Sequence, residues 1–128
     1  MAKMPEKTMG LFNDPQAMKM IATVDGEGRP NIAAKGSMMA LDDETIVYAE
    51  MGGARTKANV EVHKQVAVIV CKEFKAYQVK GEFQGFETSG DTYEQFAKHV
   101  KEKLGLDVNN AAIIKVGEVF SGGGKQIA

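Results

Sequence analysis

The chain has 128 residues, 44% of them hydrophobic, which is enough for one domain with a buried core and too few for two independent cores. Sixteen Lys and Arg residues against seventeen Asp and Glu residues give a formal net charge of −1. This balance excludes a global field that would draw the protein to nucleic acid or to an acidic membrane surface. We therefore expect any bound anion to be held by local contacts.

The N-terminal residues, the apolar segments and the single cysteine indicate the compartment in which the protein is expected. Residues 1–8 are charged and lack the apolar stretch of a signal peptide, and no segment approaches the ~20 apolar residues of a membrane span. The single cysteine, Cys71, ends the apolar run 66–71, where a small buried hydrophobic residue is more typical than a nucleophile. We expect a cytoplasmic protein that is one domain over residues 1–128.

The first half of the chain predicts three strands joined by tight turns. Residues 18–24 read as a strand, and residues 25–30 are rich in the Gly, Asp and Pro that reverse a chain. Residues 31–41 are expected to form the return strand, residues 42–44 a second turn, and residues 45–49 a third strand. We expect these three strands to form a meander.

The middle of the chain predicts a short helix and two strands. Residues 54–62 suit a helix of about three turns, which needs packing to be stable. Residues 65–71 are almost all apolar, as in a central strand covered on both faces. Apolar and polar residues alternate over residues 77–84, which indicates a strand with one solvated face. Gly85 breaks this alternation, so we expect a bulge or bend there.

The last third of the chain predicts a longer helix and a final strand. Apolar residues recur at helical spacing over residues 91–104, residues 91–94 fit a capping box, and Gly105 is expected to end the helix. Its apolar face should cover the sheet. Residues 111–120 read as the last strand, and a glycine-rich tail follows.

These elements predict a mainly β fold. Six strands, a short helix and one longer covering helix suggest a small six-stranded antiparallel barrel, because a barrel leaves no exposed strand edges. An open α+β sheet fits the same pattern and ranks second, since almost every predicted strand is short and linked to the next by a hairpin.

The run from Gly52 to Asn59 is the most informative stretch for function. It joins a predicted strand to a predicted helix and places two cations and a hydroxyl in the first helical turn. Unpaired N–H groups and the positive end of the helix dipole favour an anion there, and Arg55, Thr56 and Lys57 can add hydrogen bonds. The pattern is typical of phosphate binding. A glycine turn followed by an ordinary solvated helix end is the alternative.

The element order and several segments resemble the FMN-binding split barrel of the pyridoxamine 5′-phosphate oxidase-like family, and within it the small FMN-binding proteins and flavin reductase-like chains. No single segment decides the resemblance, but together they follow one another at suitable distances over most of the chain. The resemblance implies a six-stranded split barrel that binds FMN. The segments are residues 21–23, 46–49, 53–60, 65–68 and 77–82.

The resemblance also implies a set of flavin contacts. The basic helix start falls where the family holds the 5′-phosphate, in agreement with the argument from the helix terminus. Each residue has a plain alternative as well, such as a solvated lysine, a turn hydroxyl, a core aromatic or a solvated-face polar group. The implied contacts are Ala34, Lys35, Gly36 and Ser37 along the isoalloxazine edge, Tyr48 and Ala49 beside the ribityl chain and phosphate, Arg55, Thr56 and Lys57 at the phosphate, and Gln78 from a later strand.

Departures from the family narrow the expected activity. True pyridoxamine phosphate oxidases carry a tryptophan and an arginine and histidine pair near the C-terminus, whereas this chain has no tryptophan and ends in a glycine-rich segment. We therefore do not expect the reaction for which the family is named. The aromatic-rich loop of the deazaflavin-using relatives is also missing, which favours FMN. His63 and His99 are expected at the surface, and no cluster has metal-ligand spacing, so no metal is expected.

The resemblance implies a homodimer with flavin at the subunit seam. We expect an FMN-dependent oxidoreductase that reduces a small acceptor such as flavin or a nitroaromatic compound. A non-enzymatic FMN carrier that passes electrons between redox partners is the alternative, and a flavin-free interaction module is a third reading. No catalytic base is predicted, because the cofactor supplies the redox chemistry. Ser37 or Lys35 would stabilise the negative charge of the reduced flavin.

Overall fold

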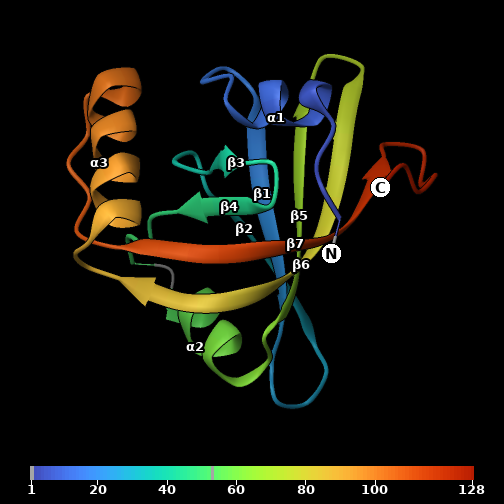
Figure 1. Cartoon of the computed structure of the whole chain (residues 1–128). Coiled ribbons are helices and arrows are strands. Elements are labelled where there is room, and N and C mark those ends of the chain that lie inside the picture. The colour runs from blue at the N-terminus through green and yellow to red at the C-terminus, as the bar shows by residue number, and fades with distance from the viewer. Residues whose placement is uncertain (1, 53) are drawn as a thin grey trace.

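Seven strands and three helices make up the described part of the chain, which is residues 2–52 and 54–128 of this computed structural model (Figure 1). The prediction of a mainly β fold is confirmed. In chain order the elements are α1 (Glu6–Phe12), β1 (Met18–Val24), β2 (Pro30–Ala34), β3 (Met39–Asp42), β4 (Thr45–Tyr48), α2 (Ala54–Val62), β5 (Gln65–Lys72), β6 (Lys75–Glu87), α3 (Asp91–Leu104) and β7 (Ala111–Ser121).

The strands form one antiparallel sheet in the order β2-β1-β5-β6-β7-β4-β3. In the described ranges the outer strands β2 and β3 do not pair with each other, so the sheet does not close on itself. This arrangement agrees with a split barrel. Figure 1 shows the long strands β6 and β7 curving across the molecule, with α1, α2 and α3 placed around the sheet.

The predicted strand over residues 31–41 is in fact two strands, which raises the strand count from six to seven. A turn interrupts it, because the N–H of Met38 donates to the carbonyl of Lys35 at 3.0 Å. As a result β2 pairs with β1, whereas β3 pairs with β4. The predicted meander is therefore wrong, and the two hairpins lie at opposite ends of the sheet.

The expected irregularity at Gly85 is confirmed. Gly85 has a φ of 131°, and the register between β6 and β7 shifts between Phe83 and Gly85. The bulge bends a 13-residue strand that pairs with β5 in its first part and with β7 along nearly its whole length. Phe86 follows the bulge, and its ring centroid lies 5.9 Å from the ammonium nitrogen of Lys57 on α2.

Two groups of buried side chains form the core. The larger group fills the inside of the sheet and includes Phe12, Ile21 and Tyr48, all fully buried. The smaller group lies under α3, where Phe96 and Val100 pack with residues of β3, β4 and β7. The prediction that the helix at residues 91–104 covers the sheet is confirmed.

The helix ends follow the sequence signals only in part. Gly105 ends α3 in the left-handed conformation, with a φ of 69°, as predicted. The predicted capping box is wrong, because Gly90 is the N-cap residue and no side chain caps the helix. Asp91 is instead the first helical residue, where its charge favours the positive end of the dipole. Helix α1 was not predicted, since seven residues are too few for a clear apolar period.

Candidate functional site

Residues 49 and 50, which follow β4 and lead toward α2, have main-chain N–H groups that donate to side chains and not to a neighbouring strand. Main-chain pairing between β4 and β7 ends at Tyr48 and Ala112. The N–H of Ala49 then donates to Oγ of Ser37 at 2.9 Å, and the N–H of Glu50 donates to Oδ1 of Asn110 at 2.8 Å. The turn after β2 and the start of β7 thus fix the chain just before the predicted phosphate loop.

A buried ion pair links this segment to the turn at residues 35–38. The ammonium of Lys35 lies 2.8 Å from Oε2 of Glu50, and the two side chains are 8% and 5% exposed. Lys35 also lies over the ring of Tyr48, with its nitrogen 5.4 Å from the ring centroid. Burial, and then the nearby charge of Glu50, raise the pKa of Tyr48 above its ordinary value.

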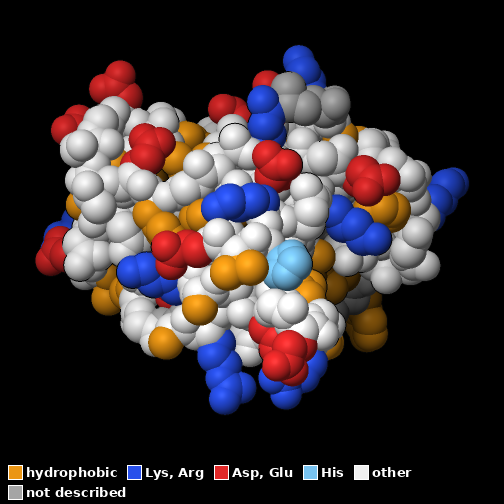
Figure 2. All heavy atoms as spheres, turned by 90° about the horizontal axis from the view of Figure 1, so that it is seen from below, with side chains coloured by type: hydrophobic (Ala, Val, Ile, Leu, Met, Phe, Trp, Pro, Cys, Tyr) orange, Lys and Arg blue, Asp and Glu red, His pale blue; other side chains and the backbone are white. Residues whose placement is uncertain are grey.

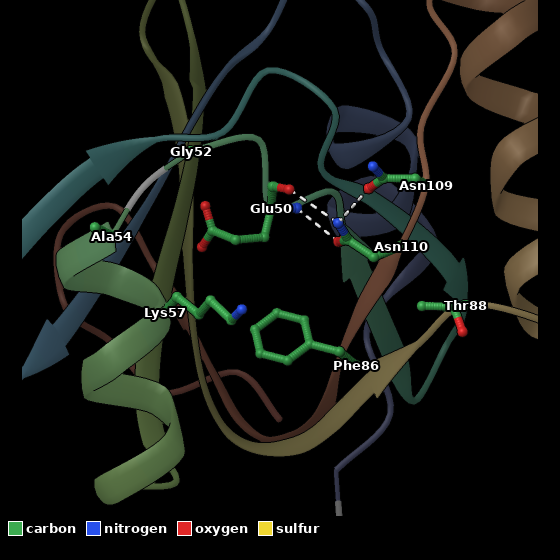
Figure 3. A pocket seen from close by; sticks show the side chains of 8 residues that line it. All are labelled: Glu50, Gly52, Ala54, Lys57, Phe86, Thr88, Asn109 and Asn110. Carbon is green, nitrogen blue, oxygen red and sulfur yellow. Dashed lines mark hydrogen bonds between the residues drawn. The ribbon is translucent and has the colours of Figure 1, made fainter.

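A cavity of about 660 Å³ opens beside Glu50, and we name it the Phe86 cavity (Figure 3). Its volume falls in the range usual for small-molecule sites. Figure 3 shows the side chains of Lys57 and Phe86 close together, facing Glu50 and the two asparagines across the space. The start of α2 therefore opens onto a cavity that the ammonium of Lys57 also lines. Its lining residues are Glu50, Gly52, Ala54, Lys57, Phe86, Thr88, Asn109 and Asn110.

A second cavity, of about 570 Å³, lies at the other partner of the ion pair, and we name it the Lys35 cavity. Small and backbone-rich residues form much of its wall, and three of its apolar residues, Met51, Leu104 and Leu106, are exposed. The structure brings together here five residues that the family resemblance placed near the flavin. These are Ala34, Lys35, Gly36, Ser37 and Ala49.

Arg55 lines a third cavity, of about 370 Å³, with Asp25, Arg29 and two asparagines. Residues two apart on a helix point about 200° apart, so Arg55 and Lys57 reach different cavities. Thr56 points to neither, because it is 2% exposed and its Oγ accepts a hydrogen bond from Asn31 at 3.4 Å. Gly53 of the predicted phosphate loop lies outside the described residues.

The remaining predicted contacts lie apart from these cavities. Tyr48 is in the core, and its hydroxyl has no hydrogen-bond partner within residues 2–52 and 54–128. Gln78 faces Ile69 of β5 and Phe120 of β7 in the sheet and lines none of the three cavities. The roles of all the predicted contacts stay predictions.

The site residues predicted from the sequence did not include Glu50, Phe86 or Asn110. Glu50 carries one local signal, an acidic residue directly after an apolar strand. The Asn110 amide meets Glu50 across a separation of 60 residues, so only the fold reveals that contact. Phe86 directly follows Gly85, where the break in the strand alternation was predicted.

The histidines do not lie at the cavities described above. His63 is exposed, and His99 is half-buried on α3, where burial and then the charges of Lys103 and Lys19 lower its pKa. Within the described ranges no three His, Cys, Asp or Glu residues are grouped as metal ligands require. None of the described helices has the length and apolar character needed to cross a membrane.

The face that carries α2 is seen in Figure 2, where basic and acidic side chains are interspersed with hydrophobic ones. This mixture agrees with the net charge of −1. The candidate site is therefore defined by its cavities and by the helix start.

A family model described as pyridoxamine 5′-phosphate oxidase matches residues 4–120. The chain belongs to this family. The family resemblance predicted from the sequence is thus confirmed. A comparison with curated proteins gives no match.

Several solved structures share this fold. HupZ of Group A Streptococcus is 26% identical, with a TM-score of 0.82 over 98% of this chain and 99% of that chain. An FMN-binding protein from Syntrophomonas wolfei is 20% identical, with a TM-score of 0.81 over 91% and 84% of the two chains. HutZ, the heme storage protein from Vibrio cholerae, is 16% identical, with a TM-score of 0.71 over 97% and 98%.

Proposed function

We propose that the chain is a cytoplasmic FMN-dependent oxidoreductase that reduces a small acceptor such as flavin or a nitroaromatic compound. One observation carries the proposal. The Lys35 cavity is lined by five residues predicted to contact flavin. The Phe86 cavity lies at the start of α2, and the ion pair between Lys35 and Glu50 contributes one residue to each cavity. The FMN-binding protein from Syntrophomonas wolfei has the same fold, which supports this choice of cofactor.

The residues present fit FMN. A flat ring system needs a slot with small side chains, and Ala33, Ala34, Gly36 and Ala49 supply such a wall in the Lys35 cavity. A phosphate needs N–H groups and a cation, and the start of α2 with Lys57 supplies both in the Phe86 cavity. We therefore assign the ring to the first cavity and the phosphate to the second.

Bound FMN supplies hydride and electron transfer, and the protein supplies placement and electrostatics. The Oγ of Ser37 accepts from Ala49, so its own proton is available to donate toward a ligand. Glu50 offsets the charge of Lys35, which weakens the positive field that Lys35 exerts in its cavity. No side chain is assigned as a general acid or base.

We also propose a homodimer with flavin at the subunit seam. Met51, Leu104 and Leu106 at the Lys35 cavity are 58%, 37% and 48% exposed, and a second copy would cover them. Gln78 lies away from the three cavities, which favours a role for it in the site of the partner subunit.

Heme is a weaker candidate for these cavities. HutZ has this fold and is a heme storage protein. Heme iron in many proteins is held by a histidine, and neither His63 nor His99 lines any of the three cavities. The helix start and Lys57 instead suit a phosphate, so FMN is the better fit.

The proposal is tested by FMN titration of the purified chain, followed by its absorption spectrum, with Arg55→Ala and Lys57→Ala as variants. Loss of one charge-assisted phosphate contact costs about 1.5 to 3 kcal/mol, or roughly ten- to a hundredfold in affinity. A loss confined to Lys57→Ala places the phosphate in the Phe86 cavity, and a loss confined to Arg55→Ala places it beside Arg55. Unchanged affinity in both variants overturns the phosphate site at α2.

The non-enzymatic electron carrier differs from the enzyme in turnover. Steady NAD(P)H oxidation with an added small acceptor supports the oxidoreductase. Fast electron exchange with a redox protein, without such turnover, supports the carrier. A protein that stays colourless after FMN is added supports the flavin-free interaction module.

A further inference from the structure

The side-chain amide of Asn110 makes the two hydrogen bonds to Glu50 that the main chain of a neighbouring strand would otherwise make. Its Oδ1 accepts from the N–H of Glu50 at 2.8 Å, and its Nδ2 donates to the carbonyl of Glu50 at 2.9 Å (Figure 3). In an antiparallel ladder, two residues of a hydrogen-bonded pair exchange the same two bonds through their main chains. The side-chain amide of Asn110 offers a matched acceptor and donor of this kind.

The position of Asn110 in the ladder explains this contact. The β4–β7 register runs from Thr45 opposite Lys115 to Tyr48 opposite Ala112, and its continuation places Glu50 opposite Asn110. Because the bonds run through a side chain, the two main chains stand further apart than in a regular pair. The Phe86 cavity lies at this separation and is lined by Glu50, Asn109 and Asn110.

Glu50 is also fixed through its own side chain. Its carboxylate holds Lys35 at 2.8 Å, and that lysine belongs to the turn that lines the Lys35 cavity. Residue 50 is thus tied by its main chain to Asn110, just before β7, and by its side chain to the turn at residues 35–38. Helix α2 begins only four residues later, at Ala54.

We propose that Asn110 and Glu50 are positioning residues that hold the β4–β7 separation open and set the start of α2 against the turn at residues 35–38. The inference rests on the proposed FMN site, because its consequence is the placement of phosphate and ring contacts relative to each other. Neither residue needs to touch the flavin for this role. Asn110 acts through Glu50, and Glu50 acts through Lys35 and the loop before α2.

The test uses Asn110→Ala and Asn110→Leu, the second of which keeps the branched shape of the side chain but removes both hydrogen bonds. Asn13→Ala is the matched control, because it also removes a side-chain bond to the main chain: Oδ1 of Asn13 accepts from the N–H of Ala40 at 2.8 Å. Asn13 lines none of the three cavities. The measurements are the FMN dissociation constant, the melting temperature, and amide hydrogen exchange at Glu50 in the flavin-free protein.

Both Asn110 variants are expected to speed exchange of the Glu50 amide and to weaken FMN binding by about tenfold. The control is expected to lower the melting temperature yet leave the FMN dissociation constant within about twofold of the wild type. Unchanged FMN binding in both Asn110 variants, or an equal loss in Asn13→Ala, overturns the inference. If the wild-type chain binds no FMN, the proposed function fails, and Glu50 exchange still decides whether Asn110 holds the loop.

Discussion

The ammonium of Lys35 and the carboxylate of Glu50 meet at 2.8 Å, with more than nine-tenths of each side chain buried. Burial costs each charge its hydration, so the pair is stable only while the partners stay together. Lys35 lines one cavity and Glu50 lines the next. This pair therefore joins the two halves of the proposed flavin site.

Separating this ion pair is expected to destabilise the fold. Lys35→Met or Glu50→Gln alone removes one buried charge and should lower the free energy of unfolding by about 3 to 5 kcal/mol. The double variant carries neither charge and should lose much less than the sum of the single losses. Urea unfolding of the four proteins measures this coupling, and strictly additive losses would contradict it.

Tyr48→Phe is expected to leave the fold as stable or to stabilise it by about 1 kcal/mol, because the Tyr48 hydroxyl is buried without a partner in the described residues. Tyr93→Phe is the matched control, since the Tyr93 hydroxyl donates to the carbonyl of Val108 at 2.7 Å. It should lose about 0.5 to 1.5 kcal/mol. A larger loss in Tyr48→Phe than in the control would show that the Tyr48 hydroxyl makes a stabilising contact.

Lys19 should make stability depend on pH in the alkaline range. Lys19 is 5% exposed, and burial lowers its pKa from 10.5 against the opposing effect of Asp14. Between the folded and unfolded pKa values the unfolded chain binds more protons, so this contribution to the free energy of unfolding rises with pH. Lys19→Met removes a buried charge and should be more stable than the wild type at pH 7.

The stability difference between Lys19→Met and the wild type should shrink as pH rises toward 10.5. Denaturant unfolding at neutral and alkaline pH measures the difference. A variant less stable than the wild type at neutral pH would indicate that the charge of Lys19 contributes more through Asp14 than its burial costs.

Gly81 is required by the close approach of β6 and β7. A Cβ at this position would lie 2.5 Å from the carbonyl oxygen of Lys115 and 2.8 Å from a methyl carbon of Ile114. Gly81→Ala should therefore cost about 1 to 3 kcal/mol. Gly123→Ala is the control, because its added Cβ would meet no described atom within 4 Å apart from those of its chain neighbours. Thermal melts compare the two variants, and equal melting temperatures would refute the close approach.

The sequence predicted those helices and strands whose signals lie within a single short segment. The helix at residues 91–104 and the bulge at Gly85 follow from apolar spacing and from one glycine. The turn that breaks residues 31–41 was not predicted, because contacts with distant residues help to hold it. Lys35 finds its partner at Glu50, and Ser37 finds its partner at Ala49, only in the folded protein.

The candidate site was also predicted only in part. The resemblance gathered Lys35, Ser37 and Ala49, and the structure places them in one cavity. The resemblance placed Arg55 and Lys57 together at the phosphate, because they are close in sequence. On the helix they point in different directions, and each lines a different cavity. Asn110 carries no local signal at all, since its amide replaces a strand partner that only the sheet defines.

The most direct test of the central claim compares the dissociation constants of FMN and riboflavin for the wild-type chain by fluorescence titration. The two ligands differ only in the phosphate, which the start of α2 is proposed to hold. We predict that FMN binds at least about tenfold more tightly than riboflavin. Equal affinity for the two ligands, or no binding of either, would contradict the claim.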